Sequence, residues 1–172
     1  MWPFAKKQRF PGIKQNPDGT IEFKLSNEEA QAADRALMAF KGMAVHQDAA
    51  DKVRNGTIAV ALSHYANDLV FMNCSIETTE AEDRANWPTI QKALKKAVAA
   101  VWKSYSLFPL PVFLYHRASF LAILGMRDEA RKLFASFLIE QSKFKMDQID
   151  KILFDYEGTD INRALSHAKK EA

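Results

Sequence analysis

Apolar residues recur every three or four positions along most of the chain, which is the period of amphipathic α-helices. The pattern predicts an all-α protein, a helical bundle with helical regions at 26–106 and 111–172. The stripes expected to face the core are Ala30, Ala33, Leu37, Phe40 and Ala44; Ile58, Leu62, Tyr65, Leu69 and Met72; Ile90, Leu94, Val98, Val101 and Tyr105; and Leu133, Phe134, Phe137 and Leu138.

Residues 13–25 follow a different period. Ile21, Phe23 and Leu25 alternate with polar residues, which is typical of a strand with one buried face. The preceding Asn16-Pro-Asp-Gly19 matches a type I turn with glycine available for the left-handed position. The sequence predicts a short N-terminal β-hairpin that needs the helices to cover its apolar face.

Helix starts and breaks are marked by local signals. Ser26 and Glu29 form a capping box, so a helix is expected from there to about Val45, before a break at 46–48. Asn55-Gly56 is expected to end or kink the next helix. Thr79 and Glu82 form a second capping box, but Pro88 is tolerated only in the first turn of a helix, so the long helix is expected to begin near Pro88.

The segment 115–134 carries spacings found in helix-pair repeats. It has a small residue, Ala118, in its first helix, Gly125 at the turn, and Ala130 and Phe134 in its second helix. This arrangement resembles one tetratricopeptide unit, covering roughly residues 111–144. Ala164 follows Ala130 after 34 positions and indicates a degenerate second copy extending to 172.

The resemblance implies a function. Tetratricopeptide proteins bind peptides of partner proteins in a helical groove, so the chain is expected to be a protein-protein interaction or adaptor module. It lacks the Lys and Asn set with which some members clamp a peptide carboxylate, and Arg117 stands where a large apolar residue is expected. The resemblance places the following residues on the inner, binding face of the first helix: Val112, Tyr115, Ser119, Ala122 and Ile123.

Composition is consistent with one globular domain over 1–172. The chain has 48% hydrophobic and 26% charged residues, a net charge of +3 and a single cysteine, Cys74. The small net charge does not indicate a nucleic-acid partner. A single cysteine fits a reducing compartment and no stretch resembles a signal peptide or a membrane span, so a cytoplasmic location is expected.

The long helix carries lysines on faces other than its apolar stripe. Lys92, Lys95, Lys96 and Lys103 could bind an acidic partner or a membrane surface. A lysine face on a core helix is more often simply solvated, and we expect that here for all four side chains.

Known catalytic motifs are missing, and no cofactor is indicated. The best couple is His64 with Asp68, four residues apart on one helix, where a carboxylate can orient an imidazole. An alternative function is therefore a small helical enzyme, or a metal- or small-molecule-binding protein, that uses this couple. Because no third group converges on it, a role other than catalysis is favoured. His46 with Asp48 and Asp51 could supply metal ligands, but a polar helix boundary explains them as well.

Residues 1–12 form an N-terminal arm. Trp2, Phe4 and Phe10 lie among Lys6, Lys7 and Arg9, a composition that could contact an anionic membrane as a peripheral protein. An arm that packs these aromatic side chains on the helical body, or that frays, is the simpler expectation.

Overall fold

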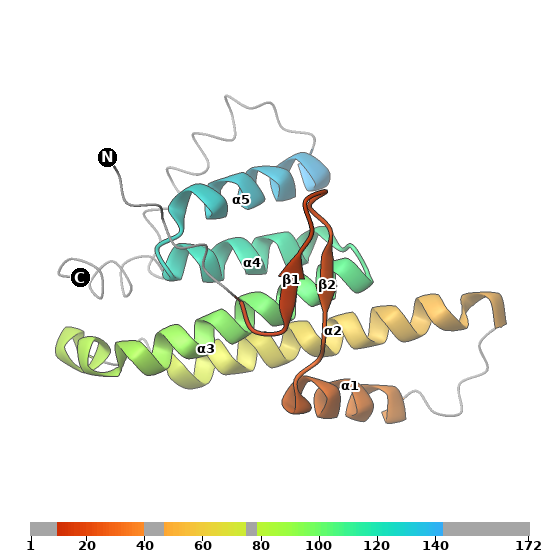
Figure 1. Cartoon of the computed structure of the whole chain (residues 1–172), viewed down its shortest axis with the longest axis horizontal. Helices are drawn as coiled ribbons and strands as arrows, with labels where there is room; N and C mark the ends of the chain where they lie inside the picture. The colour runs from red at the N-terminus through yellow and green to blue at the C-terminus, as the bar shows by residue number, and fades with distance from the viewer. Residues whose placement is uncertain (1–9, 40–46, 75–78, 143–172) are drawn as a thin grey trace.

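The computed structural model describes residues 10–39, 47–74 and 79–142. They form a helical bundle with a small antiparallel β-hairpin at the N-terminal end, which confirms the predicted fold class (Figure 1). The elements are β1 (Ile13–Gln15), β2 (Ile21–Phe23), α1 (Asn27–Ala39), α2 (Gln47–Asn73), α3 (Glu80–Leu107), α4 (Pro111–Ile123) and α5 (Arg127–Ser142). Expectations for Phe40 to Val45 and for 143–172, including the degenerate second copy, lie outside the described residues.

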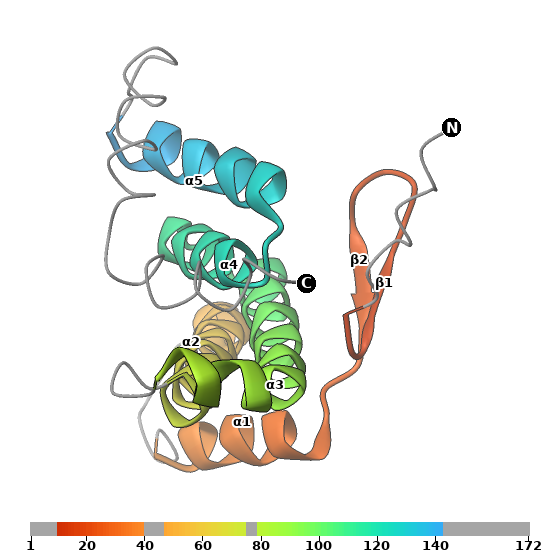
Figure 2. The same cartoon turned by 90° about the vertical axis from the view of Figure 1, so that its left-hand side faces the viewer.

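The helices are stacked in layers. α2 and α3 form the central pair and make the most extensive interhelical contact, while α1 packs on α2, α4 on α3, and α5 on α4. Figure 2 shows this stack from α1 up to α5, with the β-hairpin beside α3 on the side away from α2. The core centres on α3, where Leu94, Val98 and Val101 are fully buried.

The β-hairpin forms as its sequence predicts. Ile13 pairs with Phe23 and Gln15 with Ile21, and the turn closes with a hydrogen bond from the Gly19 amide to the Asn16 carbonyl. Gly19 has φ +87°, the left-handed conformation that glycine adopts without steric cost. Ile13, Ile21 and Phe23 are only half-buried, so the hairpin packs on the surface of the bundle and is not part of its core.

Two helix boundaries differ from the prediction. α2 runs without interruption through Asn55-Gly56, so this pair does not end a helix, while the alternative of a kink stays a prediction. α3 begins at Glu80, after a complete Thr79–Glu82 capping box, and Pro88 lies inside the helix rather than at its start. Proline cannot donate a hydrogen bond to the carbonyl four residues earlier, and both Pro88 and Arg84 lie on an exposed part of the helix.

The α4–α5 pair turns at Gly125, which has φ +87°. The Met126 amide donates to the Leu121 carbonyl at 2.9 Å and the Gly125 amide to Ala122 at 3.0 Å, which is the Schellman pattern at a helix C-terminus. Ala118, Ala130 and Phe134 are all buried. The helical hairpin is therefore present, while its relationship to tetratricopeptide repeats stays a prediction.

Candidate functional site

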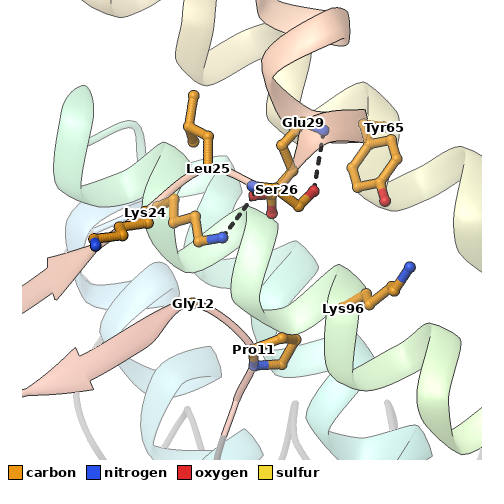
Figure 3. A pocket seen from close by; sticks show the side chains of 9 residues that line it. Pro11, Gly12, Lys24, Leu25, Ser26, Glu29, Tyr65 and Lys96 are labelled. Carbon is orange, nitrogen blue, oxygen red and sulfur yellow. Dashed lines mark hydrogen bonds and ion pairs between the residues drawn. The ribbon is translucent and has the colours of Figure 1, made fainter.

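A hollow of about 280 Å³ lies where the β-hairpin meets α1, α2 and α3 (Figure 3). Pro11 and Gly12 border it on the chain entering β1, and Lys24 to Ser26 on the chain leaving β2. The helices contribute Glu29, Tyr65, Lys96 and Lys103. The hollow therefore joins three stretches of sequence, namely the β-hairpin with the start of α1, α2 and α3, and its wall carries both positive and negative charges.

A buried ion pair forms the floor of this hollow. The Lys103 ammonium donates to the Glu29 carboxylate with an Nζ–Oε2 distance of 2.6 Å, and these side chains are only 2% and 4% exposed. The same oxygen accepts the Ser26 amide at 2.7 Å, while the Glu29 amide donates to the Ser26 hydroxyl at 3.2 Å. The predicted capping box is thus confirmed, and its glutamate also neutralises a lysine of α3.

This pair corrects the expectation that all four lysines of α3 are solvated. Lys103 lies on the α3 face that the residues beside the hairpin cover, so its charge is removed from water. An isolated buried ammonium would be strongly unfavourable, and Glu29 provides the compensating charge. Lys103 is therefore a structural residue that fixes α1 to α3.

Gly12 allows the chain to cross directly over Lys103. It has φ +69°, and its carbonyl accepts the Lys24 amide at 3.0 Å. A Cβ atom at this position would lie 2.7 Å from the Lys24 carbonyl oxygen and 3.0 Å from the Lys103 Nζ. Only glycine fits without displacing the backbone, so both conformation and space specify this residue.

A second hollow, of about 260 Å³, continues along α3 from the first. Pro11 and Lys96 border both hollows, and Pro88, Gln91, Lys92 and Lys95 complete the second one. We call the α3 side chains Lys92, Lys95 and Lys96 the lysine trough.

The charges of the lysine trough are largely uncompensated among the residues that the structure describes. Lys96 lies 3.8 Å from the Glu28 carboxylate, a long and solvent-exposed contact. Lys92 and Lys95 form no ion pair with any residue of the described part of the chain. Surface ion pairs contribute little energy even at shorter distance, so Lys96 also remains available to another anion. The trough is a local concentration of positive charge on one helix face.

Trp102 connects the hairpin side of α3 to α4. The Phe10 ring meets it edge-on with centroids 6.1 Å apart, and the Arg117 guanidinium lies 3.5 Å from the centroid of its ring. Burial lowers the pKa of Arg117 to about 10, and its Nε has no hydrogen-bond partner within the described residues. The cation–π contact with Trp102 thus accounts for a largely buried arginine at this position of α4.

The binding residues inferred from the tetratricopeptide resemblance lie at several depths. Val112 is 41% exposed, whereas Ser119 and Ile123 are buried at 8% and 3% exposure. The Ser119 hydroxyl donates to the Tyr115 carbonyl at 3.0 Å, and the Tyr115 ring packs beside two phenylalanines of α5, Phe134 and Phe137. Tyr115 and Ala122 are half-buried. A ligand could reach this face mainly through Val112, Tyr115 and Ala122.

The alternative catalytic couple is on the surface. His64 and Asp68 are both exposed on α2, and no hydrogen bond or ion pair joins them within the described residues. The Nδ1 atom of His116 on α4 instead lies 3.1 Å from the Ser63 hydroxyl oxygen on α2. Burial, and then the neighbouring charge of His64, lower the pKa of His116. The sequence offered no partner for His116, because Ser63 lies 53 residues away.

The Ser63–His116 contact lacks the remaining parts of a nucleophilic site. Ser63 is only 5% exposed, and Phe120 stacks against the imidazole with centroids 6.4 Å apart. No cluster of three histidine, cysteine, aspartate or glutamate side chains with metal-binding geometry occurs among the described residues. We therefore interpret the contact as a polar tie between α2 and α4.

The remaining predictions concern the N-terminal arm, the metal ligands around His46, membrane-spanning helices and Cys74. Trp2, Phe4 and His46 lie outside the described residues. Within the described helices, none is both long and apolar enough to cross a bilayer. Cys74 is half-buried beside the core, and its pKa is raised to about 11 by burial and by the charge of Asp83, which fits the small buried hydrophobe expected from the sequence.

No protein-family model, curated protein or solved structure matches this chain. Its function therefore has to be argued from its own residues.

Proposed function

We propose that the protein is an interaction module whose lysine trough binds an acidic segment of a partner protein. The observation that carries this proposal is the contrast in charge along one face of α3. Lys103 is neutralised by Glu29, whereas Lys92 and Lys95 have no carboxylate partner in the described chain and Lys96 has only a distant one. Charge that has no partner among the described residues is available to a partner outside them.

The shape of the trough supports a protein segment as the ligand. Two adjoining hollows of about 280 and 260 Å³ follow α3 for several turns and share Pro11 and Lys96. Such a shallow, elongated surface fits an extended chain better than a small molecule, which usually binds in a deep and mostly apolar pocket. Pro88 and Pro11 provide apolar contact between the charges.

The class of function agrees with the resemblance of residues 111–144 to a tetratricopeptide unit, since such proteins bind partner peptides. The trough is a different surface from the inner face of α4, where Val112 and Tyr115 were expected to contact the ligand. Ser119 and Ile123 of that face are buried, so the trough offers the more accessible surface. The expected cytoplasmic location remains part of this proposal.

A peptide titration of the full chain tests the proposal. A fluorescent peptide rich in glutamate and aspartate should bind with an affinity that falls steeply with salt, because the contacts are between solvent-accessible charges. Replacing Lys92 and Lys95 together by glutamine should weaken binding about tenfold, at roughly 0.7 kcal/mol for each lost charge contact. Fluorescence anisotropy at several salt concentrations measures both effects.

Lys132→Gln provides a matched control, because Lys132 is an exposed lysine of α5 that does not line either hollow. It lowers the net charge without altering the trough, so it should leave the affinity within about twofold of the parent. Two results would contradict the proposal. One is that the corresponding glutamine- and asparagine-rich peptide binds as tightly as the acidic peptide, and the other is that Lys132→Gln loses as much affinity as the Lys92 and Lys95 double variant. Tighter binding to a single-stranded oligonucleotide would replace the protein segment by a nucleic acid.

A further inference from the structure

The solvent-facing side of α2 has an unusual composition. Its residues are spaced alternately by four and three positions, which places them in one narrow stripe along the helix. We call this set the α2 stripe, and it consists of Val53, Thr57, Val60, His64, Asn67 and Phe71.

Half of the α2 stripe is apolar, and these apolar side chains are exposed. Val53, Val60 and Phe71 are 40%, 42% and 83% exposed, and the stripe contains no lysine, arginine, aspartate or glutamate. The opposite face of α2 is buried in the bundle, with Ala59 and Leu62 at 0% exposure. The solvent side of a bundle helix normally carries charged residues, so this stripe has the composition of an interface.

The spacing of the stripe reads the same in both directions. The intervals four, three, four, three, four are symmetric about position 62. A two-fold symmetric contact requires a surface that is complementary to itself, and two antiparallel copies of this stripe meet that condition. Their facing layers are Val53 with Phe71, Thr57 with Asn67, and Val60 with His64 of the second copy.

The polar layer is also complementary in this arrangement. The Thr57 hydroxyl donates to the Val53 carbonyl at 2.8 Å, which leaves its oxygen lone pairs free to accept a hydrogen bond from the Asn67 amide group of the second copy. A polar residue in the seam of two paired helices fixes their register, because a shifted pair would set it against an apolar side chain. The Thr57–Asn67 layer therefore selects the symmetric register.

The flanking charges are complementary as well. Arg54 and Asp68 are exposed on one flank of the stripe, each one position after a stripe residue. Neither forms an ion pair with a described residue. In the antiparallel pair Arg54 of one copy lies beside Asp68 of the other, and symmetry makes this contact twice. In a parallel two-fold pair the flank that carries Arg54 and Asp68 would lie on opposite sides of the interface in the two copies, so these two side chains would not meet.

We propose that α2 pairs antiparallel with α2 of a second copy of this chain, through the α2 stripe. The pair has the alternating spacing of a coiled coil, with the Phe71 rings covering Val53 at both ends. α2 lies on the side of α3 away from the β-hairpin, so the lysine trough stays open in the dimer (Figure 2). This inference is independent of the proposed acidic ligand.

Cysteine crosslinking tests the pairing directly, in a Cys74→Ala background of the full chain. Ala61 lies one residue from the symmetry centre, so Ala61→Cys brings two thiols close to each other across the axis. A maleimide crosslinker that spans the distance between packed helices, about 8–10 Å, should join them. Val53→Cys is the matched control, because its two copies would lie about 27 Å apart along an antiparallel pair.

Preferential crosslinking of the Ala61→Cys protein supports the proposal. Equal crosslinking of both variants, or crosslinking of Val53→Cys alone, would overturn it, the latter in favour of a parallel pair. A parent protein that sediments as a monomer throughout the micromolar range would also overturn it and would point to another partner, or to a segment of the same chain, as the cover of the stripe.

Charge reversal provides a second test that does not depend on a crosslinker. Arg54→Glu and Asp68→Arg should each weaken dimerisation about tenfold, because each reverses two contacts by symmetry. The double variant recreates both pairs and should return to within about threefold of the parent. Lys52→Glu, an exposed charge one position before the first stripe residue, should leave the dimer unchanged. Sedimentation equilibrium measures all four, and a double variant as weak as the single ones would overturn the antiparallel geometry.

Discussion

The two surfaces that could bind a partner are built in opposite ways. The lysine trough of α3 consists of solvent-accessible charges without a close carboxylate in the described chain, whereas the inner face of α4 is largely occupied by the chain's own side chains. Tyr115 on that face already packs against Phe134 and Phe137. The difference is in accessibility: the lysine side chains of the trough are open to an outside partner, whereas much of the α4 face is already in contact with α5.

The sharpest test of this distinction lies within α3 itself. Lys103→Met leaves the Glu29 carboxylate buried without its counter-ion and should lower the free energy of unfolding by about 3 to 5 kcal/mol. Lys92→Met removes an exposed charge and should change it by less than about 0.5 kcal/mol. Urea denaturation measures both variants.

A double variant separates the buried charge from simple packing. Replacing Glu29 by glutamine together with Lys103→Met removes both charges and should recover part of the loss. If Lys103→Met alone is as stable as Lys92→Met, then Lys103 is not held in a buried ion pair and the contrast within α3 disappears.

The second prediction concerns the apolar construction of the α4–α5 pair. Phe134 is 5% exposed and Ala130 6% exposed, at the contact between the two helices. Phe134→Ala should cost about 3 to 5 kcal/mol by opening a cavity. Ala130→Leu should cost about 1 to 3 kcal/mol by overpacking. Denaturant midpoints equal to the parent for both variants would mean that this pair is not a packed unit.

A smaller effect is expected from the contact between α2 and α4. Burial and the charge of His64 lower the pKa of His116, whereas in the unfolded chain its imidazole titrates at about 6.5. Around and below that pH the unfolded chain binds more protons than the folded chain. The free energy of unfolding should therefore fall as the pH decreases, and it should level off above about pH 6.5. His116→Gln should flatten this dependence in denaturation curves from pH 5 to 8. An identical pH profile for the two proteins would contradict a buried, neutral His116.

Features that depend on neighbouring residues could be predicted from the sequence. The capping boxes at Ser26 and Thr79 and the turn at Gly19 use contacts within four positions, and the structure confirms each of them. Helical periodicity likewise predicts the direction of a buried face. Periodicity does not show how far the covering helices extend along that face. The pattern placed Met72 in the core, which is wrong, because its side chain is 83% exposed.

The candidate site depended on contacts that the sequence does not indicate. Lys103 differs from Lys92 because Glu29, 74 positions earlier, reaches it and because the chain at Gly12 covers it. The position of Pro88 inside α3 was missed for a related reason, since the cost of a proline in a helix depends on its surroundings in the folded chain, and Pro88 lies on an exposed part of α3. The charge pattern could therefore name four candidate lysines, but it could not divide them into one structural and three accessible residues.

The two surfaces can be distinguished in a single titration. We propose that the lysine trough, and not the inner face of α4, binds an acidic segment. Heteronuclear NMR of the full chain, titrated with the acidic peptide, should shift the signals of Gln91, Lys92, Lys95 and Lys96 while those of Val112, Tyr115 and Ala122 stay in place. Shifts confined to the α4 residues would contradict the account and move the binding surface to the tetratricopeptide-like hairpin.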